Sequence, residues 1–248
     1  MEPAEVRLMF AVEKEHWWFA GKRLAIKTLL AGLPLDPGGW VLDLGCGTGA
    51  LVQELSEQYQ ALGLDYDPIC LGLACRRGGG PFIRGTAARL PLGSQSISLL
   101  VAADVLYHRQ VEVGAALKEF HRVLKPGGWL LILDSAYQGL MGRHDAAVHG
   151  ARRFARGGLC LRLQKAGFTV HRATYRNTVL APLLIAARLY ARFFPGREED
   201  GASLRSDVGL PPAWLNGFLL AIMRLEARWL KRHNLAFGTT VCALARKD

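Results

Sequence analysis

A glycine-rich loop between a short apolar strand and a helix is the feature that most constrains the fold of this chain. Residues 41–44 read as a buried strand, residues 45–49 are Gly-Cys-Gly-Thr-Gly, and residues 50–59 have helical spacing. Glycines allow a sharp turn and let a ligand approach the backbone closely. The helix N-terminus beyond them offers free N–H groups and a positive dipole. This order predicts a ligand site at the loop.

An acidic residue at the end of the next predicted strand narrows the kind of ligand. That strand covers residues 61–65 and ends at Asp65, twenty residues after Gly45. A carboxylate there can accept two hydrogen bonds from a ribose diol. A glycine-rich loop alone is weak evidence, but strand, loop, helix, strand and acid at this spacing predict a cofactor that contains a nucleoside.

Short apolar strands alternate with helical segments along the rest of the chain. The predicted strands are residues 40–44, 61–65, 82–84, 97–103, 129–134, 169–175 and 239–245. The predicted helices between them lie near residues 49–58, 68–76, 111–123 and 159–166. This alternation predicts an α/β fold, a mostly parallel sheet with helices on both faces. We expect four parts, namely an N-terminal helical lid (1–30), a core (31–175), an inserted helical cap (176–237) and the last core strand (238–248).

Several motifs that follow one another along the chain resemble those of one family. Asp43 precedes the GxGxG run, and residues 85–91, 103–108 and 122–128 read GTAARLP, ADVLYH and RVLKPGG. Over about residues 40–175 the chain resembles the class I S-adenosylmethionine (SAM)-dependent methyltransferases. The HWWF run at residues 16–19 is similar to the N-terminal segment of a methyltransferase-11-like bacterial subgroup. The resemblance implies a Rossmann-like, seven-stranded sheet, SAM as the cofactor and S-adenosylhomocysteine as the product.

The resemblance also implies which residues hold SAM. The glycine loop would pass under the methionine part, Asp65 would hold the ribose hydroxyls and Tyr66 would lie against the adenine. Thr86 stands where the family usually has Asp, and a hydroxyl accepts a hydrogen bond more weakly than a carboxylate does. Arg23 could pair with the SAM carboxylate or remain a solvated charge. The predicted cofactor-binding residues are Asp43, Gly45, Cys46, Gly47, Gly49, Asp65, Tyr66, Thr86, Ala87, Ala88, Ala103, Trp17 and Arg23.

Methyl transfer requires a pocket that excludes water and, where the acceptor loses a proton, a general base. The adjacent indoles in residues 16–19 could close over the cofactor, or could only pack the N-terminal helix onto the sheet. His108, after the fourth strand, is our first candidate for a base or a substrate-orienting group, and a structural histidine is the alternative. Tyr107 and His16 are the other candidate catalytic residues.

Basic and aromatic residues after the fifth strand could bind the methyl acceptor. Arg152 and Arg153 could hold a phosphate or carboxylate by forked hydrogen bonds. The predicted substrate-binding residues are Trp18, Tyr137, His149, Arg152 and Arg153. The histidines of this segment have no companion acid at metal-ligand spacing, so we predict no metal site.

The positive charge lies entirely in the C-terminal part of the chain. Residues 1–137 hold 13 Lys and Arg against 14 Asp and Glu, whereas residues 138–248 hold 18 against 7. Such asymmetry could attract an acidic substrate, nucleic acid or an anionic membrane, or could be a solvated surface. The predicted cap has apolar stretches with arginines spaced along them, which suits a substrate pocket, a dimer face or a membrane surface.

The remaining sequence features set the class of protein. No apolar run reaches the roughly 18 residues that span a bilayer. The five scattered cysteines predict reduced thiols, and the N-terminus does not read as a signal peptide, so we expect a cytoplasmic protein. We predict a SAM-dependent methyltransferase that acts on O or N of a small or lipid-like metabolite. The alternatives are an RNA or protein methyltransferase that docks through its basic half, and a non-catalytic SAM-binding subunit; without a separate nucleic-acid module, nucleic acid is not the expected partner.

Overall fold

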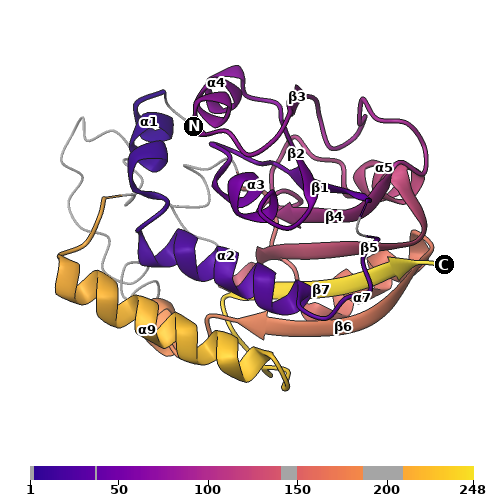
Figure 1. Ribbon diagram of the computed structural model, residues 1–248. Coiled ribbons are helices and arrows are strands. Elements are labelled where there is room, and N and C mark those ends of the chain that lie inside the picture. Colours follow the sequence, from indigo (N-terminus) through magenta and orange to yellow (C-terminus); the bar gives the residue numbers. More distant parts are fainter. Residues whose placement is uncertain (1–2, 37, 141–149, 187–208) are drawn as a thin grey trace.

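A seven-stranded sheet forms the centre of the computed structural model, which describes residues 3–36, 38–140, 150–186 and 209–248 (Figure 1). The strand order is β3-β2-β1-β4-β5-β7-β6. The strands are β1 (Trp40–Leu44), β2 (Gln60–Asp65), β3 (Phe82–Arg84), β4 (Ile97–Ala103), β5 (Leu124–Ser135), β6 (Phe168–Arg176) and β7 (Thr240–Lys247). The helices are α1 (Pro3–Val12), α2 (Trp17–Leu30), α3 (Ala50–Leu55), α4 (Pro68–Arg77), α5 (Val113–Val123), the 3₁₀ helix η1 (Gln138–Leu140), α7 (Arg156–Lys165) and α9 (Ala213–Leu230).

The strand directions confirm the predicted Rossmann-like sheet. Strands β1 to β5 pair in parallel, and β7 is antiparallel to both of its neighbours, β5 and β6. Because parallel strands end at one edge, the segments that follow β1, β2, β4 and β5 come together there. We call this edge of the sheet the carboxyl edge, and the candidate site lies there.

Strand β5 is longer than the sequence predicts. Pro126, Gly127 and Gly128 read as a turn, so the expected strand begins at residue 129. In the structure β5 begins at Leu124 and continues through this segment as a bulge. The register with β4 shifts there, between Ile97 and Leu99. Gly127 takes a φ of +75°, which absorbs the extra residues without ending the strand.

Two apolar layers cover the two faces of the sheet. Leu42 and Leu44 pack on one face with residues of α5 and α7. Val41 points to the other face, where it packs with residues of α2 and α3. The period of two along β1 therefore divides the strand between two cores, as expected for a sheet that is buried on both sides.

Helix α9 lies along the outside of α2, within the region predicted as a cap (Figure 1). Two contacts fix this packing: the N–H of Trp17 donates to Asn216 Oδ1 (2.9 Å), and Met223 fills the space beside Gly21. Glu226 of α9 is 6% exposed, and its carboxylate accepts the backbone N–H groups of residues 177 and 178. Residues 181–186 are also helical.

No described helix is long and apolar enough to cross a bilayer.

Candidate functional site

Four aspartates gather at the carboxyl edge of the sheet. Asp43 lies in β1, Asp65 ends β2, Asp104 follows β4 and Asp134 lies near the end of β5. Three of them are almost completely buried, with Asp43 4%, Asp65 8% and Asp134 0% exposed. Buried carboxylates require partners. The partners of each acid therefore show which of them is available to a ligand.

The glycine loop is held against β2 by its own N–H groups. Gly45 donates to the carbonyl of Leu64 (2.7 Å), and Gly47 donates to Asp65 Oδ2 (2.9 Å). The φ angles of Gly45, Gly47 and Gly49 are +73°, +53° and +85°. A Cβ on Gly45 would also lie 2.7 Å from Val105 Cγ2. Glycine is thus required here both by the backbone conformation and by close packing.

Asp65 is oriented by two backbone donors, as a ribose-binding carboxylate would need to be. Its Oδ2 accepts from Gly47, and its Oδ1 accepts from the N–H of Asp67 (2.9 Å). Burial raises the pKa of Asp65, and these two hydrogen bonds oppose the rise. Each oxygen keeps a second lone pair for a ligand. Tyr66, the next residue, is 50% exposed and leaves a ring face available.

The turn predicted to face the adenine borders open space. Thr86 and Ala88 are exposed, whereas Ala87 is buried. A surface pocket of about 580 Å³ is lined by residues 84–86 and 89–92. Cys46, the second residue of the loop, is buried, and Ala103 ends β4.

Asp43 is a buried carboxyl group without a hydrogen bond to any described residue. Burial raises its pKa to about 8; Lys22 opposes this rise, and Asp65 and Glu13 add to it. A carboxyl group in this state has acceptor positions left for a donor or a cation. Asp43 is therefore the edge residue best suited to a positively charged ligand group.

Lys22 of α2 closes over the edge by pairing with Asp104. Lys22 Nζ lies 2.8 Å from Asp104 Oδ2. Burial opposes ionisation of Asp104, but Lys22, Arg176 and His108 together hold its pKa below the usual range. We did not select Asp104 from the sequence as a site residue, because its partner lies 82 residues away.

The N-terminal segment is clamped to the glycine loop by buried charges. Glu13 bonds to the hydroxyl of Thr48 and forms an ion pair with Arg77 (2.8 Å). Burial raises the pKa of Glu13, and Thr48 and Arg77 oppose the rise. Arg23 donates to the carbonyl of Glu13 (2.7 Å) and to Glu54 Oε1 (2.6 Å). The guanidinium of Arg23 is thus engaged with Glu13 and Glu54. Its predicted contact with the SAM carboxylate stays a prediction.

The aromatic segment joins the two outer helices. His16 caps α2, with Nδ1 accepting from the N–H of Trp18 (3.2 Å), and burial lowers the pKa of His16. The backbone of Trp17 bonds to α9. The ring of Trp18 lies 5.3 Å from the guanidinium of Arg176, at the end of β6. The segment therefore packs the N-terminal helices, and Trp18 also reaches the carboxyl edge.

Arg176 is a buried cation that we did not predict. It is 1% exposed, and its Nη1 has no hydrogen-bond partner among the described residues. Its Nη2 lies 3.9 Å from Met223 Sδ. It ends β6 and so lies at the carboxyl edge with the four acids. No sequence pattern distinguishes it from the other arginines of this region.

His108 and Tyr107 lie at the edge, beyond β4. Their rings stack with centroids 4.2 Å apart, and His108 forms a β-bridge with Gly150. The N–H of Tyr107 donates to Asp134 Oδ2 (3.2 Å). Burial and then the charge of Asp104 raise the pKa of Asp134 well above its usual value. Asp134 therefore holds the segment that carries both candidates.

The two predicted anion-binding arginines donate to backbone carbonyls. Arg152 Nη1 donates to the carbonyls of Leu106 (3.2 Å) and Val111, and Arg153 Nη1 donates to that of Ala136 (3.1 Å). These bonds fix the segments after β4 and β5. Binding of a substrate anion by either arginine stays a prediction.

The other predicted substrate residues are Tyr137 and His149. Tyr137 stacks on Tyr175 (5.2 Å between centroids), and burial followed by a hydrogen bond with Tyr175 raises its pKa to about 12. His149 lies outside the described residues.

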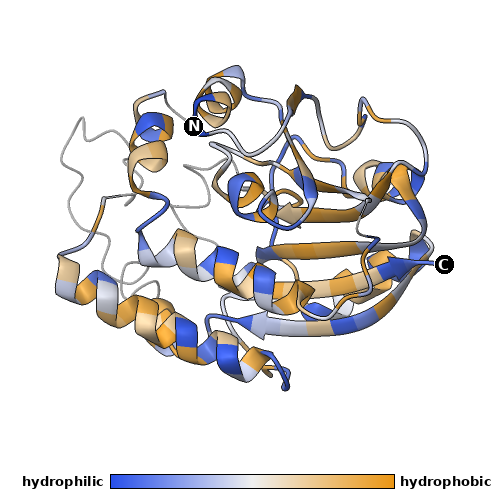
Figure 2. Cartoon of the chain, in the orientation of Figure 1, coloured by the Kyte–Doolittle hydropathy of each residue, from blue (hydrophilic) through white to orange (hydrophobic). Residues whose placement is uncertain are grey.

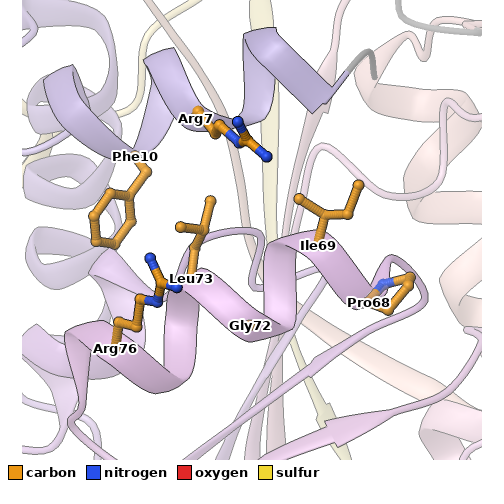
Figure 3. A pocket seen from close by; sticks show the side chains of 7 residues that line it. All are labelled: Arg7, Phe10, Pro68, Ile69, Gly72, Leu73 and Arg76. Atoms are coloured by element: carbon orange, nitrogen blue, oxygen red, sulfur yellow. The ribbon is translucent and has the colours of Figure 1, made fainter.

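A second pocket, of about 480 Å³, lies between α1 and α4 (Figure 3). Arg7 and Phe10 of α1 face Ile69 and Leu73 of α4 across it, as Figure 3 shows. None of the four edge aspartates lines this pocket. The pocket therefore does not include the acids of the carboxyl edge.

Comparison with known proteins agrees with this geometry. Residues 42–132 match the family described as "Methyltransferase domain". The chain is 30% identical over 115 residues to malonyl-(acyl-carrier protein) O-methyltransferase 1 of Coxiella burnetii, covering 45% of this chain and 39% of that protein. It is 33% identical over 122 residues to demethylmenaquinone methyltransferase of Lactobacillus johnsonii, covering 44% and 49%. The chain thus spans less than half the length of each of these relatives.

A solved structure shares the fold over most of the chain. Phosphoethanolamine N-methyltransferase 2 of Haemonchus contortus, in complex with SAM, matches with a TM-score of 0.59 and 16% identity. The match covers 90% of this chain and 52% of that one. At this identity the likeness concerns the fold alone.

Proposed function

We propose that this chain is a SAM-dependent methyltransferase, with residues 42–132 as its methyltransferase domain, and that it methylates O or N of a small or lipid-like metabolite. The observation that carries the proposal is the orientation of Asp65 by Gly47 and Asp67 beside the glycine loop. That arrangement leaves a buried carboxylate with free lone pairs at the place where a ribose would lie.

The charges of the carboxyl edge also fit this cofactor. SAM carries a positive sulfonium and a positive ammonium group, and it supplies an electrophilic methyl group when bound. Asp43 has no hydrogen bond to a described residue and would pair with the ammonium group, while Asp65 would hold the ribose. The glycine loop would leave room for the methionine part.

The acceptor would lie where α2 meets the edge. Trp18 and Lys22 of α2 reach the ends of β6 and β4 and help to exclude water there. His108 would orient the acceptor or remove its proton. A lipid-like acceptor agrees with the names of two relatives, which act on malonyl-(acyl-carrier protein) and on demethylmenaquinone, whereas a third is named a probable tRNA methyltransferase. The five cysteines form no disulfide, which suits the reducing cytoplasm that we propose as the location.

One experiment distinguishes the proposed function from the two alternatives, an RNA or protein methyltransferase and a non-catalytic SAM-binding subunit. Labelled methyl from SAM is supplied with the protein to fractionated cell extract, and label is measured in the lipid, small-molecule, RNA and protein pools. Label in the lipid or small-molecule pool supports the proposal. Label in RNA or protein would indicate an enzyme that docks through its basic C-terminal half. SAM binding without transfer would indicate a non-catalytic subunit.

The affinity for SAM should rise with pH in a way that depends on Asp43. Its pKa of about 8 means that the free protein holds a proton on Asp43 at neutral pH. Binding of a cation favours the ionised form and releases that proton, so affinity should rise up to about tenfold per pH unit between roughly pH 6 and pH 8. Calorimetry of the wild type and of Asp43→Asn measures both slopes.

The variant should bind SAM more weakly and with little dependence on pH. Asp36→Asn, at an exposed acid paired with Lys125, is the matched control and should keep the wild-type slope. The raised pKa also has a consequence for stability. Asp43 stabilises the free fold at pH values below its ordinary pKa, and this contribution is lost as the pH rises towards about 8. An unchanged slope in Asp43→Asn would assign the released proton to another group.

His108→Ala should lower turnover roughly tenfold while SAM affinity is retained, because the residue faces the acceptor and not the cofactor. Single-turnover methyl transfer and SAM titration measure the two quantities separately. His233→Ala, at an exposed histidine that contacts Trp229 after α9, is the control and should leave both unchanged. Unaltered turnover in His108→Ala would leave His108 with a structural role.

A further inference from the structure

Helix α9 carries a stripe of large apolar side chains on its outer surface. Trp214 is 74%, Phe218 60%, Leu225 62% and Trp229 55% exposed. Their spacing of four, seven and four residues places them on one face of the helix. Large apolar side chains that are exposed in one row indicate a contact surface, whereas exposed apolar residues scattered singly are normal on any protein.

The opposite face of α9 is also apolar, and it is buried against the rest of the protein. Met223, Ala227 and Leu230 are between 0% and 4% exposed and pack inward. Figure 2 shows hydrophobic residues along much of the length of α9, on the outside of α2. The outer stripe is therefore additional to the face that holds the helix on the protein.

The border of the stripe is cationic. Arg224 and Arg228 lie on α9, Lys231 and Arg232 follow it, and all four residues are exposed. The one acid in residues 209–239 is Glu226, which is 6% exposed and accepts backbone N–H groups. The outer surface of this segment thus presents positive charge and no negative charge.

Three further large apolar side chains outside α9 are exposed. Val179 is 60%, Leu183 68% and Phe237 46% exposed. The hydroxyl of Thr178 bonds to the carbonyl of Phe237, and the N–H of Thr178 donates to Glu226 (2.7 Å). These contacts place residues 178–179 and Phe237 beside α9. We call the outer face of α9, with Trp214, Phe218, Leu225 and Trp229, the α9 surface.

We propose that the α9 surface docks on an anionic lipid membrane. Tryptophan and other large apolar side chains would enter the boundary between headgroups and acyl chains, and the arginines and lysine would meet anionic headgroups. This docking goes beyond the proposed methyl transfer and does not depend on it.

Charge favours lipid over a second copy of the chain. A symmetric dimer through this surface would bring the same patch of both protomers together. Arg224, Arg228 and Lys231 would then crowd against their own counterparts, without an exposed acid in residues 209–239 to pair with them. A nucleic acid would meet the charges but leave the indoles and Leu225 in water. An anionic bilayer meets both.

Co-sedimentation of the full chain with vesicles tests the docking. One set of vesicles is phosphatidylcholine alone, and the other contains phosphatidylglycerol as well. The wild type should bind the anionic vesicles and lose most of this binding at high salt. Phe218→Ser and Trp229→Ser should each weaken binding about tenfold, because a large apolar side chain is lost from the boundary. Arg224→Gln together with Arg228→Gln should weaken it by a similar factor on anionic vesicles only.

Leu161→Ser is the matched control. Leu161 is 59% exposed on α7, which packs on the other face of the sheet from α2. This variant should bind vesicles as the wild type does. Failure of the wild type to bind anionic vesicles would overturn the proposal, and so would an equal loss in Leu161→Ser. A concentration-dependent dimer in light scattering that Phe218→Ser abolishes, with vesicle binding unchanged, would assign the surface to a second copy.

Discussion

Asp65→Ala is expected to weaken SAM binding by about 100-fold or more, with the fold retained. The carboxylate would accept two ribose hydroxyls, and hydrogen bonds to a charged group contribute about 1.5–3 kcal/mol each. Losing two of them costs at least about 3 kcal/mol, which corresponds to more than 100-fold in affinity. Isothermal titration with SAM measures the change, and urea unfolding checks that the variant is folded.

Asp67→Ala is the control for Asp65→Ala. Asp67 lies two residues away and caps α4, where its side chain accepts the N–H of Ile69 (2.8 Å). Its loss should cost about 1 kcal/mol of stability and leave SAM affinity nearly unchanged. Asp65 also accepts hydrogen bonds from the N–H groups of Gly47 and Asp67. If Asp65→Ala and Asp67→Ala weakened SAM binding equally, the cause would be a loosened loop and not the loss of contacts with the ribose. Undiminished affinity in Asp65→Ala would refute the assignment of the ribose site.

Glu226→Ala is expected to lower the free energy of unfolding by about 2–5 kcal/mol, because each of two buried N–H donors left without an acceptor costs about 1–3 kcal/mol. The Glu226 carboxylate accepts the N–H groups of Asn177 and Thr178, which have no other described acceptor. Removing it leaves buried donors unsatisfied and detaches α9 from the end of β6. Urea denaturation measures the change.

Two further variants sharpen this second prediction. Glu226→Gln keeps one acceptor oxygen and should lose roughly half as much stability, or about 2 kcal/mol. Glu57→Ala, at an exposed glutamate after α3, should change stability by less than about 0.5 kcal/mol. A loss below about 1 kcal/mol in Glu226→Ala would mean that water satisfies these donors.

The parts of the fold that local sequence determines could be predicted. The alternation of apolar strands with helices fixed the number and class of the strands, and the positions of the glycine loop and Asp65 followed from spacing along one βαβ unit. Strand β5 was misjudged at its start, because Pro126 and the glycines after it are typical of a turn. Only pairing with Ile97 shows that the strand continues through them.

The electrostatics of the site could not be read from the sequence, since they depend on distant pairs. Lys22 meets Asp104 across 82 residues, and Arg77 reaches the clamp around Glu13 from α4. Arg152 and Arg153 looked free for an anion, but backbone carbonyls accept their hydrogen bonds. Such acceptors exist at every residue, so no spacing of side chains reveals them.

The position of β7 has a consequence for folding during synthesis. β7 lies between β5 and β6, yet it leaves the ribosome more than sixty residues after β6 does. Until then β6 has no neighbouring strand, and the free edge of β5 stays open to pairing with other chains. The last strand therefore completes the sheet, and a nascent chain that stalls before Thr240 would present the free edge of β5 and an unpaired β6 to its surroundings.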